Sequence, residues 1–336
     1  MPFHIQNAPP EHGIRVPHQV MENFVQDLFL AVGTSKEHAR HMAVALTTND
    51  LRCVFSHGTQ QTADYTLQMR LGHTNPRPQI TVVSESDATA VLDGDGGLGY
   101  FPAHRGTEMA IKKALNVGVA TVTTRNHFHF GAAGNYSRLA LPHNCICMAI
   151  SSHRFQPNPN ASVMSATGGS PMSIAIPTEN QPPLVLDMGA YILPRDENLM
   201  AQYPIAYFKS LGLGAVFQAL GGMLAGIWND GFQHSGQGEG AAPQQGAFIA
   251  VFDIRRFIDV PTFKQEMDRY IAQARSTKPL PGFDRAELAG GMEYIWEQDH
   301  RKIGIPVTDD HRSKLEKVAE TIGVHAPFAQ FEHTRF

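Results

Sequence analysis

The sequence predicts a globular protein of the α/β class, and three observations support this prediction. The chain has 336 residues, of which 42% are hydrophobic and 17% charged, a composition typical of a folded chain with a large core. Helical patterns dominate the first third. In the middle of the chain, short apolar runs alternate with helical patterns, which is the arrangement found in α/β proteins.

The first helix is predicted over about residues 35–50. Thr34 and Glu37 have the spacing of a capping box, in which a hydroxyl and a carboxylate each satisfy a free backbone N–H at the helix start. Four apolar side chains then follow at helical spacing: Ala39, Met42, Ala43 and Leu46. A second helix is predicted from about residue 59 to 71, so that His57 lies at the junction between the two helices.

The middle and the end of the chain contain the predicted strands. They cover residues 80–83, 88–92, 119–124, 145–151, 172–176, 184–186 and 247–252. Helices are predicted over residues 102–115, from about Ala132, from Lys209, and over 262–274 and 312–322, with a Gly/Gln-rich loop at 234–245.

One apolar stretch, residues 211–228, tests the prediction of a globular protein. It is interrupted by a single polar residue, Gln218, and contains a G-x-x-x-G at Gly222 and Gly226, as some membrane helices do. Its five glycines lower its hydrophobicity, and polar sequence flanks it on both sides. We therefore predict a buried core helix and no membrane span.

Charge and cysteine content exclude several other classes. Lys and Arg number 27 against 31 Asp and Glu, so the formal net charge of −4 offers no basic surface for nucleic acid. The three cysteines are too few for a disulfide framework and lack the paired spacing of a zinc site. The N-terminus has neither the basic region nor the apolar run of a secretory signal. We expect a cytoplasmic protein without a structural metal.

A literal G-x-G-x-x-G runs from Gly94 to Gly99 between a predicted strand and a predicted helix. This is the position of a dinucleotide-binding fingerprint in a Rossmann fold. Against that interpretation, the next strand ends in Arg125 where a ribose-binding carboxylate is expected. A calcium loop starting at Asp93 fits less well, because its twelfth position is His104 instead of Glu. A plain glycine turn is the preferred interpretation.

Two histidines, His127 and His129, follow the strand 119–124 where a helix is expected to begin. The N-terminus of a helix favours a neutral imidazole and anionic ligands beside it, which suits an active site. The H-x-H pattern also occurs at metal sites, but the further ligands of such a site are not evident. The remaining alternative is a pair of histidines with a purely structural role. The 17 histidines of the chain raise the expectation of proton transfer without locating it.

Five segments in register resolve these alternatives. They are Leu51-Arg52-Cys53-Val54-Phe55-Ser56-His57-Gly58, residues 92–99, the stretch 126–136 with His129-Phe130-Gly131, Leu186-Asp187-Met188, and Phe208-Lys209-Ser210-Leu211-Gly212-Leu213. Together they resemble the type-2 malate/L-lactate dehydrogenases, a family that also contains ureidoglycolate, sulfolactate and diketogulonate oxidoreductases and cyclic imino-acid reductases. The resemblance spans about residues 15–325.

The resemblance implies a non-Rossmann α/β fold. Residues 1–85 and 290–336 would form a helical domain for substrate and subunit contacts, and residues 86–289 a mixed, mostly antiparallel sheet domain that binds NAD or NADP. The G-x-G-x-x-G then becomes a structural turn. Family members are homodimers, so a homodimer acting on a small-molecule substrate is implied.

The resemblance also implies roles for individual residues. His57 matches the acid/base residue, Asp187 a carboxylate that orients this imidazole, and His129 a histidine for proton transfer or substrate binding. Lys209 matches a cofactor-contacting lysine, where a helix start and an ammonium would hold phosphate. The other residues expected to bind the cofactor are Phe208, Pro183, Leu186, Met188, Gly189, Gly290 and Gly291. Those expected to bind substrate are Arg52, Gln61, His127 and His153.

Several positions depart from the family pattern. Gln61 stands where a carboxylate-binding Arg is usual, and a neutral amide cannot replace a bidentate guanidinium. His153 stands at a position that is often Ser, Gly-Thr-Asn-Pro becomes 168–171 Gly-Gly-Ser-Pro, and Pro-Gly-Glu becomes Ala289-Gly290-Gly291. The sequence therefore predicts an NAD(P)H-dependent oxidoreductase for a 2-oxo acid or cyclic imine with atypical carboxylate recognition. The alternative is a non-catalytic member that binds ligands or acts as a scaffold.

Overall fold

The computed structural model describes residues 7–155, 158–160, 162–232 and 243–336. These residues form two compact units. One, the helical unit, contains residues 7–77 and 271–336, and the other, the sheet unit, contains the described parts of 78–232 and 243–270. Most of the Gly/Gln-rich loop predicted at 234–245 lies outside the described residues.

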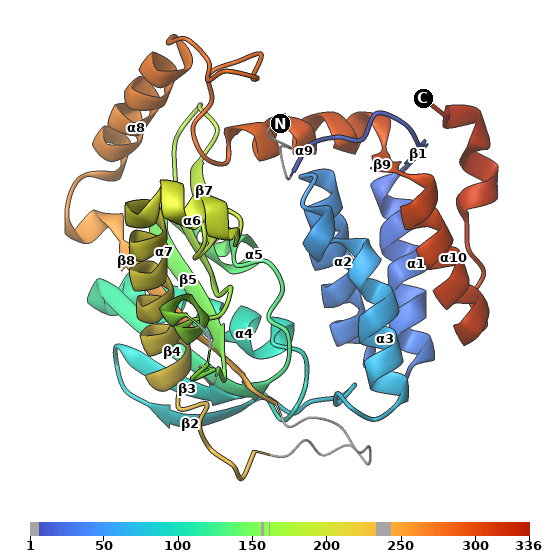
Figure 1. Cartoon of the computed structure of the whole chain (residues 1–336), viewed down its shortest axis with the longest axis horizontal. Coiled ribbons are helices and arrows are strands. Elements are labelled where there is room, and N and C mark those ends of the chain that lie inside the picture. The colour runs from blue at the N-terminus through green and yellow to red at the C-terminus, as the bar shows by residue number, and fades with distance from the viewer. Residues whose placement is uncertain (1–6, 156–157, 161, 233–242) are drawn as a thin grey trace. The chain divides into compact units, whose positions relative to one another are not determined.

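The helical unit is assembled from both ends of the chain (Figure 1). Strand β1 (Ile14–Val16) pairs antiparallel with β9 (Ile305–Val307), which joins the two chain segments. Its helices are α1 (His18–Ala31), α2 (Lys36–Leu51), α3 (Thr62–Arg70), α9 (Gly291–Ile303) and α10 (Asp309–Ile322), with short 3₁₀ turns η1 (Phe55–His57), η2 (Thr59–Gln61) and η7 (Phe328–Thr334). The helical domain made from both chain ends, which the resemblance implied, is thus confirmed.

The start of α2 differs by one residue from the prediction. Ser35 is the N-cap, and its Oγ accepts a hydrogen bond from the backbone N–H of His38 over 3.1 Å. The capping box predicted at Thr34 and Glu37 is wrong, because the hydroxyl of Thr34 donates to Sδ of Met69 instead. The apolar stripe of α2 was predicted correctly, since Ala39, Met42 and Leu46 are all buried.

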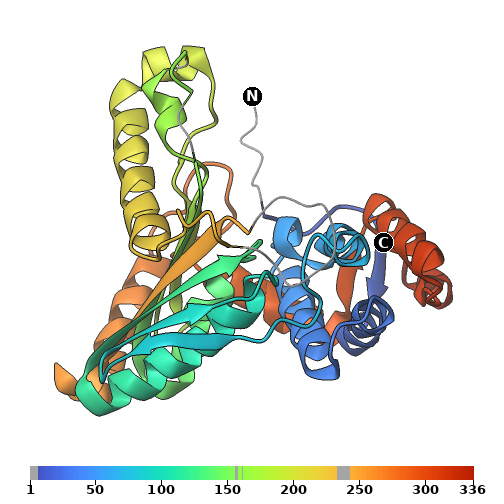
Figure 2. The same cartoon turned by 90° about the horizontal axis from the view of Figure 1, so that it is seen from below.

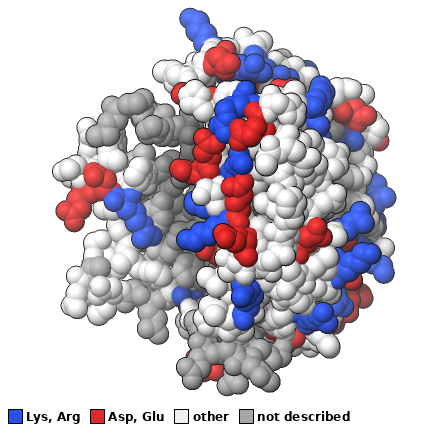
Figure 3. Space-filling view, turned by 90° about the vertical axis from the view of Figure 1, so that its right-hand side faces the viewer, with Lys and Arg blue, Asp and Glu red and all other residues white. Residues whose placement is uncertain are grey.

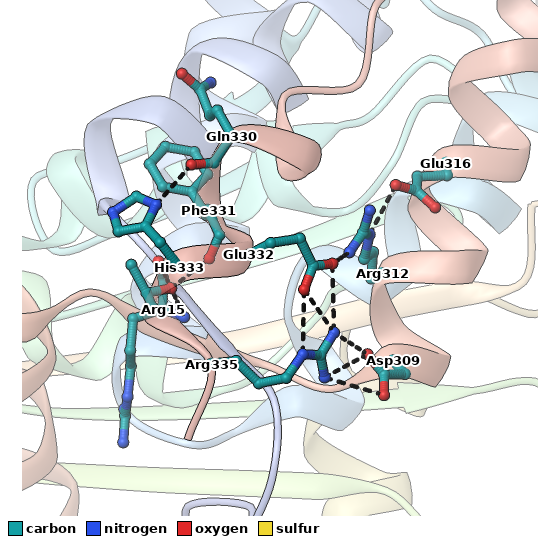
Figure 4. A network of polar contacts seen from close by, with 10 residues as sticks. Arg15, Asp309, Arg312, Glu316, Gln330, Phe331, Glu332, His333 and Arg335 are labelled. Atoms are coloured by element: carbon teal, nitrogen blue, oxygen red, sulfur yellow. Dashed lines mark hydrogen bonds and ion pairs between the residues drawn. The ribbon is translucent and has the colours of Figure 1, made fainter.

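A polar network holds η7 against α10 (Figure 4). Arg335 lies 3.1 Å from Asp309 and 3.0 Å from Glu332, and Arg312 bonds both Glu332 and Glu316. Single exposed ion pairs contribute little, but a connected set fixes one arrangement of the segment. On the face shown in Figure 3, acidic and basic side chains are interspersed.

The sheet unit contains a seven-stranded sheet within the described residues, in the order β2-β3-β4-β8-β5-β6-β7. The strands are β2 (Thr81–Glu85), β3 (Thr89–Asp93), β4 (Val119–His127), β5 (Cys145–His153), β6 (Pro171–Ile176), β7 (Leu184–Gly189) and β8 (Gln245–Asp253). Only the β3–β4 pair is parallel. The mixed, mostly antiparallel sheet is therefore confirmed, and the Rossmann interpretation of the glycine motif is excluded, since that fold needs a mainly parallel sheet.

Alternate residues of the central strands pack against helices on opposite faces of the sheet (Figure 2). Val122, Ala149 and Ile249 belong to a buried cluster with side chains of α4 (Tyr100–Val117). Ile150, in contrast, packs with Phe217 of α7 (Pro204–Phe217). The remaining helices of this unit are α5 (Gly134–Ser137), α6 (Glu197–Gln202) and most of α8 (Val260–Arg275).

The apolar stretch 211–228 is only half buried. It forms the end of α7 and a π-helical turn, η5 (Gln218–Met223), and its buried side includes Gly214 and Phe217. The opposite side is exposed and apolar, with Ile205 and Phe208 before it and Val216, Met223 and Leu224 within it. The predicted burial of the whole helix is wrong, because one sheet face covers one side of a helix only. Among the described residues, no helix is long and apolar enough to cross a membrane.

Candidate active site

His57 ends the 3₁₀ turn η1, which follows α2 after residues 52–54. Its Nδ1 lies 3.0 Å from Oγ of Ser56, and its carbonyl oxygen accepts a hydrogen bond from Nδ2 of Asn49 over 2.8 Å. The imidazole is half-buried, and burial lowers the pKa of His57. The ring is thus held beside Ser56 and through its backbone, and the lowered pKa means that the imidazolium releases its proton readily.

Two residues expected to bind the substrate carboxylate, Arg52 and Gln61, have partners within the helical unit. Nε of Arg52 lies 2.6 Å from Oε2 of Glu297, and both side chains are largely buried. Burial alone would raise the pKa of Glu297, but the charges of Arg52 and Arg301 lower it. Gln61 donates its side-chain amide to the carbonyl oxygen of Ser56. The charge of Arg52 is therefore already paired, and Gln61 carries no charge.

His127, at the end of β4, is enclosed by the sheet unit. It is 0% exposed, its Nδ1 donates to the carbonyl oxygen of Phe128 over 2.8 Å, and its Nε2 lies 2.9 Å from the hydroxyl of Thr124. Burial lowers the pKa of His127 to about 4, so the ring is neutral. Both ring nitrogens are engaged by protein atoms, which leaves none for a substrate.

The glycine motif packs against this same imidazole. A Cβ at Gly99 would lie 2.6 Å from Nδ1 of His127, and a Cβ at Gly94 would lie 2.8 Å from the Cβ of His127. These two glycines are required because the turn passes directly over the ring. The motif is a structural turn in this protein.

His129 and Asp187 belong to neighbouring parts of the sheet unit. His129 is half-buried in the loop after β4, and its carbonyl oxygen accepts from the backbone N–H of Gly99. Asp187 lies on β7, where its Oδ2 accepts from the N–H of Gly134 over 3.0 Å and is 4.0 Å from Arg138. The carboxylate is thus held by the first residue of α5.

His153, the last residue of β5, contacts a segment that also departs from the family pattern. A Cβ at Gly168 would lie 2.5 Å from Cε1 of His153, so the ring occupies the space beside residues 168–171. Burial lowers the pKa of His153. Its carbonyl oxygen accepts from Nε2 of Gln218, and Ser152 lies 2.9 Å from Ser170. His153 therefore packs against Gly168, the residue directly before the departures at Gly169 and Ser170.

The residues expected to bind the cofactor lie in both units. β7 is the last strand of the sheet, so in the described chain its backbone pairs with β6 only. Leu186 is 38% exposed and Gly189 is open, whereas Pro183 and Met188 are half-buried, Met188 packing beneath α7. Gly290 and Gly291 begin α9 in the helical unit.

Phe208 and Lys209 are exposed on α7. The prediction that a helix begins at Lys209 is wrong, because α7 begins at Pro204, whose fixed φ and missing N–H suit a first helical position. Lys209 therefore lies beyond the first turn, where helix N–H groups are already bonded within the helix. Only its ammonium is available for a phosphate.

The site residues thus divide between the two units. His57, Arg52, Gln61, Gly290 and Gly291 belong to the helical unit, and the others belong to the sheet unit. Among the described residues, no group of three or more His, Cys, Asp or Glu side chains could hold a metal ion.

Sequence reasoning missed a buried set of polar side chains behind His57. Asp50 is 0% exposed and bonds Thr59, which in turn bonds His311. A carboxylate at the end of an apolar helix face, directly before the segment 51–58, was the available signal. The contribution of His311 could not be found, because it depends on a contact across 252 positions.

Comparison with known proteins identifies one family. The sequence pattern of the family described as malate/L-lactate dehydrogenase matches residues 16–202 and 194–316. A malate dehydrogenase of Pyrococcus horikoshii is 28% identical over 94% of this chain and 97% of its own length. An L-sulfolactate dehydrogenase of Methanocaldococcus jannaschii is 28% identical over 90% of this chain and 96% of its own length.

A solved structure supports the same relationship. The malate dehydrogenase of Pyrococcus horikoshii OT3 superimposes with a TM-score of 0.82 and 26% identity, covering 95% of this chain and 98% of that one. Sequence pattern, length and fold agree over nearly the whole chain. The chain therefore belongs to the malate/L-lactate dehydrogenase family.

Proposed function

We propose that this protein is an NAD(P)H-dependent oxidoreductase that interconverts a small 2-oxo acid, or a related cyclic imine, and its 2-hydroxy or amino acid. The observation that carries the proposal is the half-buried imidazole of His57, fixed by Ser56 and Asn49 on a turn within the segment 16–202 that matches the family pattern. The relatives named malate and L-sulfolactate dehydrogenase suggest the substrate class.

His57 is the proton donor in reduction and the proton acceptor in oxidation. We assign the proton transfer to its half-buried imidazole, which lies beside Oγ of Ser56. A lowered pKa makes the imidazolium a stronger acid toward the developing alkoxide and keeps the ring unprotonated for the reverse step. Asp187, held by Gly134, would stabilise the charged imidazole, and His129 would position the substrate.

The chain fits a nicotinamide cofactor, which when bound supplies the hydride for C2 of the substrate. The free edge of β7 offers backbone N–H and C=O groups, with Leu186, Asp187 and Gly189 exposed along it. Lys209 is exposed on α7, and its ammonium is proposed to hold a phosphate of the cofactor. Pro183, Met188, Phe208, Gly290 and Gly291 would complete the cofactor contacts.

Carboxylate recognition is proposed to be atypical. The charge of Arg52 is balanced by Glu297, and the amide of Gln61 holds the turn of His57. The enclosed ring of His127 is assigned a structural role, and His153 and His129 are proposed as the imidazoles that meet a polar group of the substrate. We infer a substrate whose acidic group is absent, weaker or differently placed than in malate or lactate.

The decisive experiment follows reduced nicotinamide by absorbance with a panel of 2-hydroxy acids, 2-oxo acids and cyclic imines. NAD(H) and NADP(H) are supplied separately, because the choice between them is part of the question. Turnover on any member supports the proposal. A folded protein that binds neither cofactor refutes it. Cofactor binding without turnover on the whole panel supports the second candidate, a non-catalytic ligand-binding protein. The neutral Gln61, at a position where an arginine would bind the substrate carboxylate, favours this candidate.

The exposed apolar side of α7 supports a homodimer. Ile205, Val216 and Met223 are 71%, 50% and 63% exposed, and monomeric proteins seldom leave several such side chains together in water. We propose that this side, in the sheet unit, contacts a second copy. Ile205→Asp is expected to convert a dimer to monomer in sedimentation velocity, with Val163→Asp, at a 68% exposed side chain outside α7, as the control. A dimer unchanged by Ile205→Asp refutes this surface.

The free thiols of Cys53, Cys145 and Cys147 suit the reducing cytoplasm, which we propose as the location of this protein.

A further inference from the structure

Asp50 is a fully buried carboxylate in the last turn of α2. Within hydrogen-bond distance it has the backbone N–H of Thr59, 3.2 Å from Oδ1, and the hydroxyl of Thr59, 2.5 Å from Oδ2. It is 0% exposed, and Thr59 is also 0% exposed. A buried carboxylate is costly unless it is well bonded, so Thr59 is tied to Asp50.

The hydroxyl of Thr59 has a second partner on another helix. Nε2 of His311, in the first turn of α10, lies 2.8 Å from Oγ1 of Thr59, and His311 is 2% exposed. The ring of His311 also meets the ring of Phe55 edge-on, with 6.4 Å between centroids. A continuous chain of two hydrogen bonds thus joins Asp50 to His311 through one hydroxyl.

This chain lies directly under the turn that carries His57. Gly58 is pressed against Asp50, because a Cβ at residue 58 would overlap Oδ1 of that carboxylate. Thr59 follows His57 by two residues, and Phe55 begins the same turn. Any movement of Asp50 or Thr59 is therefore transmitted to the backbone on both sides of the imidazole.

Few charges act on this buried chain. Burial raises the pKa of Asp50 to about 7, although the bonds from Thr59 oppose that change. Burial lowers the pKa of His311 to about 3, and the charge of Lys314 on α10 lowers it further. Cys53, at the end of α2, remains a neutral thiol because burial and the charge of Asp50 raise its pKa. Asp50 is therefore the group of this set that exchanges a proton near neutral pH.

We propose that Asp50, Thr59 and His311 form a buried positioning relay for His57, in which the Thr59 hydroxyl reverses its direction of donation when Asp50 gains or loses a proton. The consequence for turnover rests on the proposed proton transfer by His57. The relay itself is a property of the folded chain without cofactor or substrate.

The two arrangements balance in protons. With Asp50 ionised, Nε2–H of His311 donates to Oγ1 of Thr59, whose hydroxyl donates to Asp50. When a proton from solvent reaches Nδ1 of His311, the Nε2 proton moves to Oγ1 and the hydroxyl proton moves to Oδ2 of Asp50. Asp50 is then neutral and donates to Thr59, Thr59 donates to Nε2, and His311 is again neutral with its proton on Nδ1. In both arrangements the hydroxyl of Thr59 donates one hydrogen bond and accepts another. The turn that carries His57 is therefore held both above and below neutral pH.

The test compares the wild-type protein with Thr59→Val, Thr59→Ser and Thr66→Val, all labelled with ¹⁵N-histidine for NMR. Valine has the shape of threonine without its hydroxyl, whereas serine keeps the hydroxyl. Thr66 is the matched control, since it is 0% exposed and its hydroxyl bonds the carbonyl of Thr62 in its own helix. Ring ¹⁵N shifts report the tautomer of His311 and the titration of His57 between about pH 5 and about pH 9.

In the wild type, His311 is expected to change from the Nε2–H to the Nδ1–H tautomer as the pH falls through about 7. Thr59→Val should abolish this change, shift the titration of His57 by about half a pH unit or more, and lower kcat about tenfold with an unchanged KM for cofactor. Thr59→Ser and Thr66→Val should behave as the wild type.

Two results would overturn the relay. One is a single His311 tautomer across the whole pH range in the wild type, a measurement that does not depend on any variant folding. The other is a His57 titration in Thr59→Val that matches the control. Because neither needs turnover, failure of the relay is distinguishable from failure of the proposed function, which would appear as full activity in a His57 variant with the relay intact.

Discussion

The side-chain amide of Gln61 donates a hydrogen bond over 2.8 Å to the carbonyl oxygen of Ser56, the residue directly before the imidazole of His57. A residue predicted to meet the substrate carboxylate is thus also part of the support for the acid/base turn. Substitution of Gln61 therefore changes two properties, charge and turn geometry, which must be separated.

Gln61→Arg is expected to improve turnover of simple 2-oxo acids at the expense of the native substrate. A guanidinium can still donate to the carbonyl of Ser56, and it adds a charge-assisted pair with a carboxylate, about 1.5 to 3 kcal/mol or roughly 10- to 100-fold in kcat/KM. Steady-state kinetics on pyruvate and oxaloacetate measure this. Gln61→Met removes the bond to Ser56 without adding charge and should lower kcat on every substrate. Ordinary dehydrogenase rates on pyruvate in the wild type, with no change in Gln61→Arg, would refute the inference.

His57→Gln is expected to lower kcat by about two to four orders of magnitude while cofactor affinity, measured by fluorescence titration, stays nearly constant. The wild-type kcat/KM for oxidation should rise with pH through an apparent pKa below the ordinary histidine value of about 6.5, because burial disfavours the imidazolium. This limb should disappear in the variant. A pH–rate profile that keeps the limb would reassign the proton transfer, with His129 as the next candidate.

Lys209→Met is expected to raise the Kd for the reduced cofactor by about 5- to 50-fold, with kcat at saturation little changed. The methionine keeps the length of the side chain and removes the ammonium that would hold a phosphate. Calorimetric titration with each nicotinamide cofactor gives the comparison. Lys302→Met, at an exposed lysine of α9, is the control. Equal Kd values for the two variants would remove Lys209 from the cofactor site.

His127→Phe tests whether His127 has a structural role, through the pH dependence of the free energy of unfolding. The native fold holds this ring neutral, with its pKa lowered to about 4, whereas the unfolded chain protonates it near about 6.5. The contribution of the neutral His127 to the free energy of unfolding is therefore fully present above about pH 6.5. It is lost as the pH falls toward about 4. The variant should be about 1 to 3 kcal/mol less stable at neutral pH, because Thr124 and the carbonyl of Phe128 lose their partner.

Urea unfolding at two pH values measures the difference. Between neutral pH and pH 5 the deficit of the variant should shrink by roughly 2 kcal/mol, since only the wild type must bind this proton on unfolding. The acid sensitivity that arises from His311 is common to both proteins and cancels. Parallel pH dependences for the two proteins would contradict the enclosed, neutral state of His127.

Local patterns predicted the elements well where the period was strong. The stripe Ala39, Met42 and Leu46 located α2, and each predicted strand of the sheet was found within a few residues of its place. The start of α2 was misplaced by one position because Thr34 and Ser35 can both cap a helix, and the contact of Thr34 with Met69 decides between them. That contact joins the turn between α1 and α2 to α3 and leaves no trace in the local pattern.

Long-range relationships account for what the sequence did not predict. An apolar helix pattern indicates which side chains avoid water but not what covers them, so the stretch 211–228 was predicted to be buried although Val216, Met223 and Leu224 are exposed. The motif segment predicted His127 as a substrate-binding residue, but its enclosure by Gly94 and Gly99 depends on how the turn crosses the end of β4, which the local sequence does not record. The ion pair of Arg52 with Glu297 joins residues 245 positions apart.

Strand β8 lies between β4 and β5 and forms hydrogen bonds with both. β4 ends at His127 and β5 at His153, but β8 begins only at Gln245. During synthesis, the two strands that flank the centre of the sheet must therefore wait with open edges until most of the chain has left the ribosome. Such edges are sites of misassociation between chains, and pairing over so long a separation is slow. Aggregation therefore competes with closure of the sheet mainly in the interval before β8 has been synthesised.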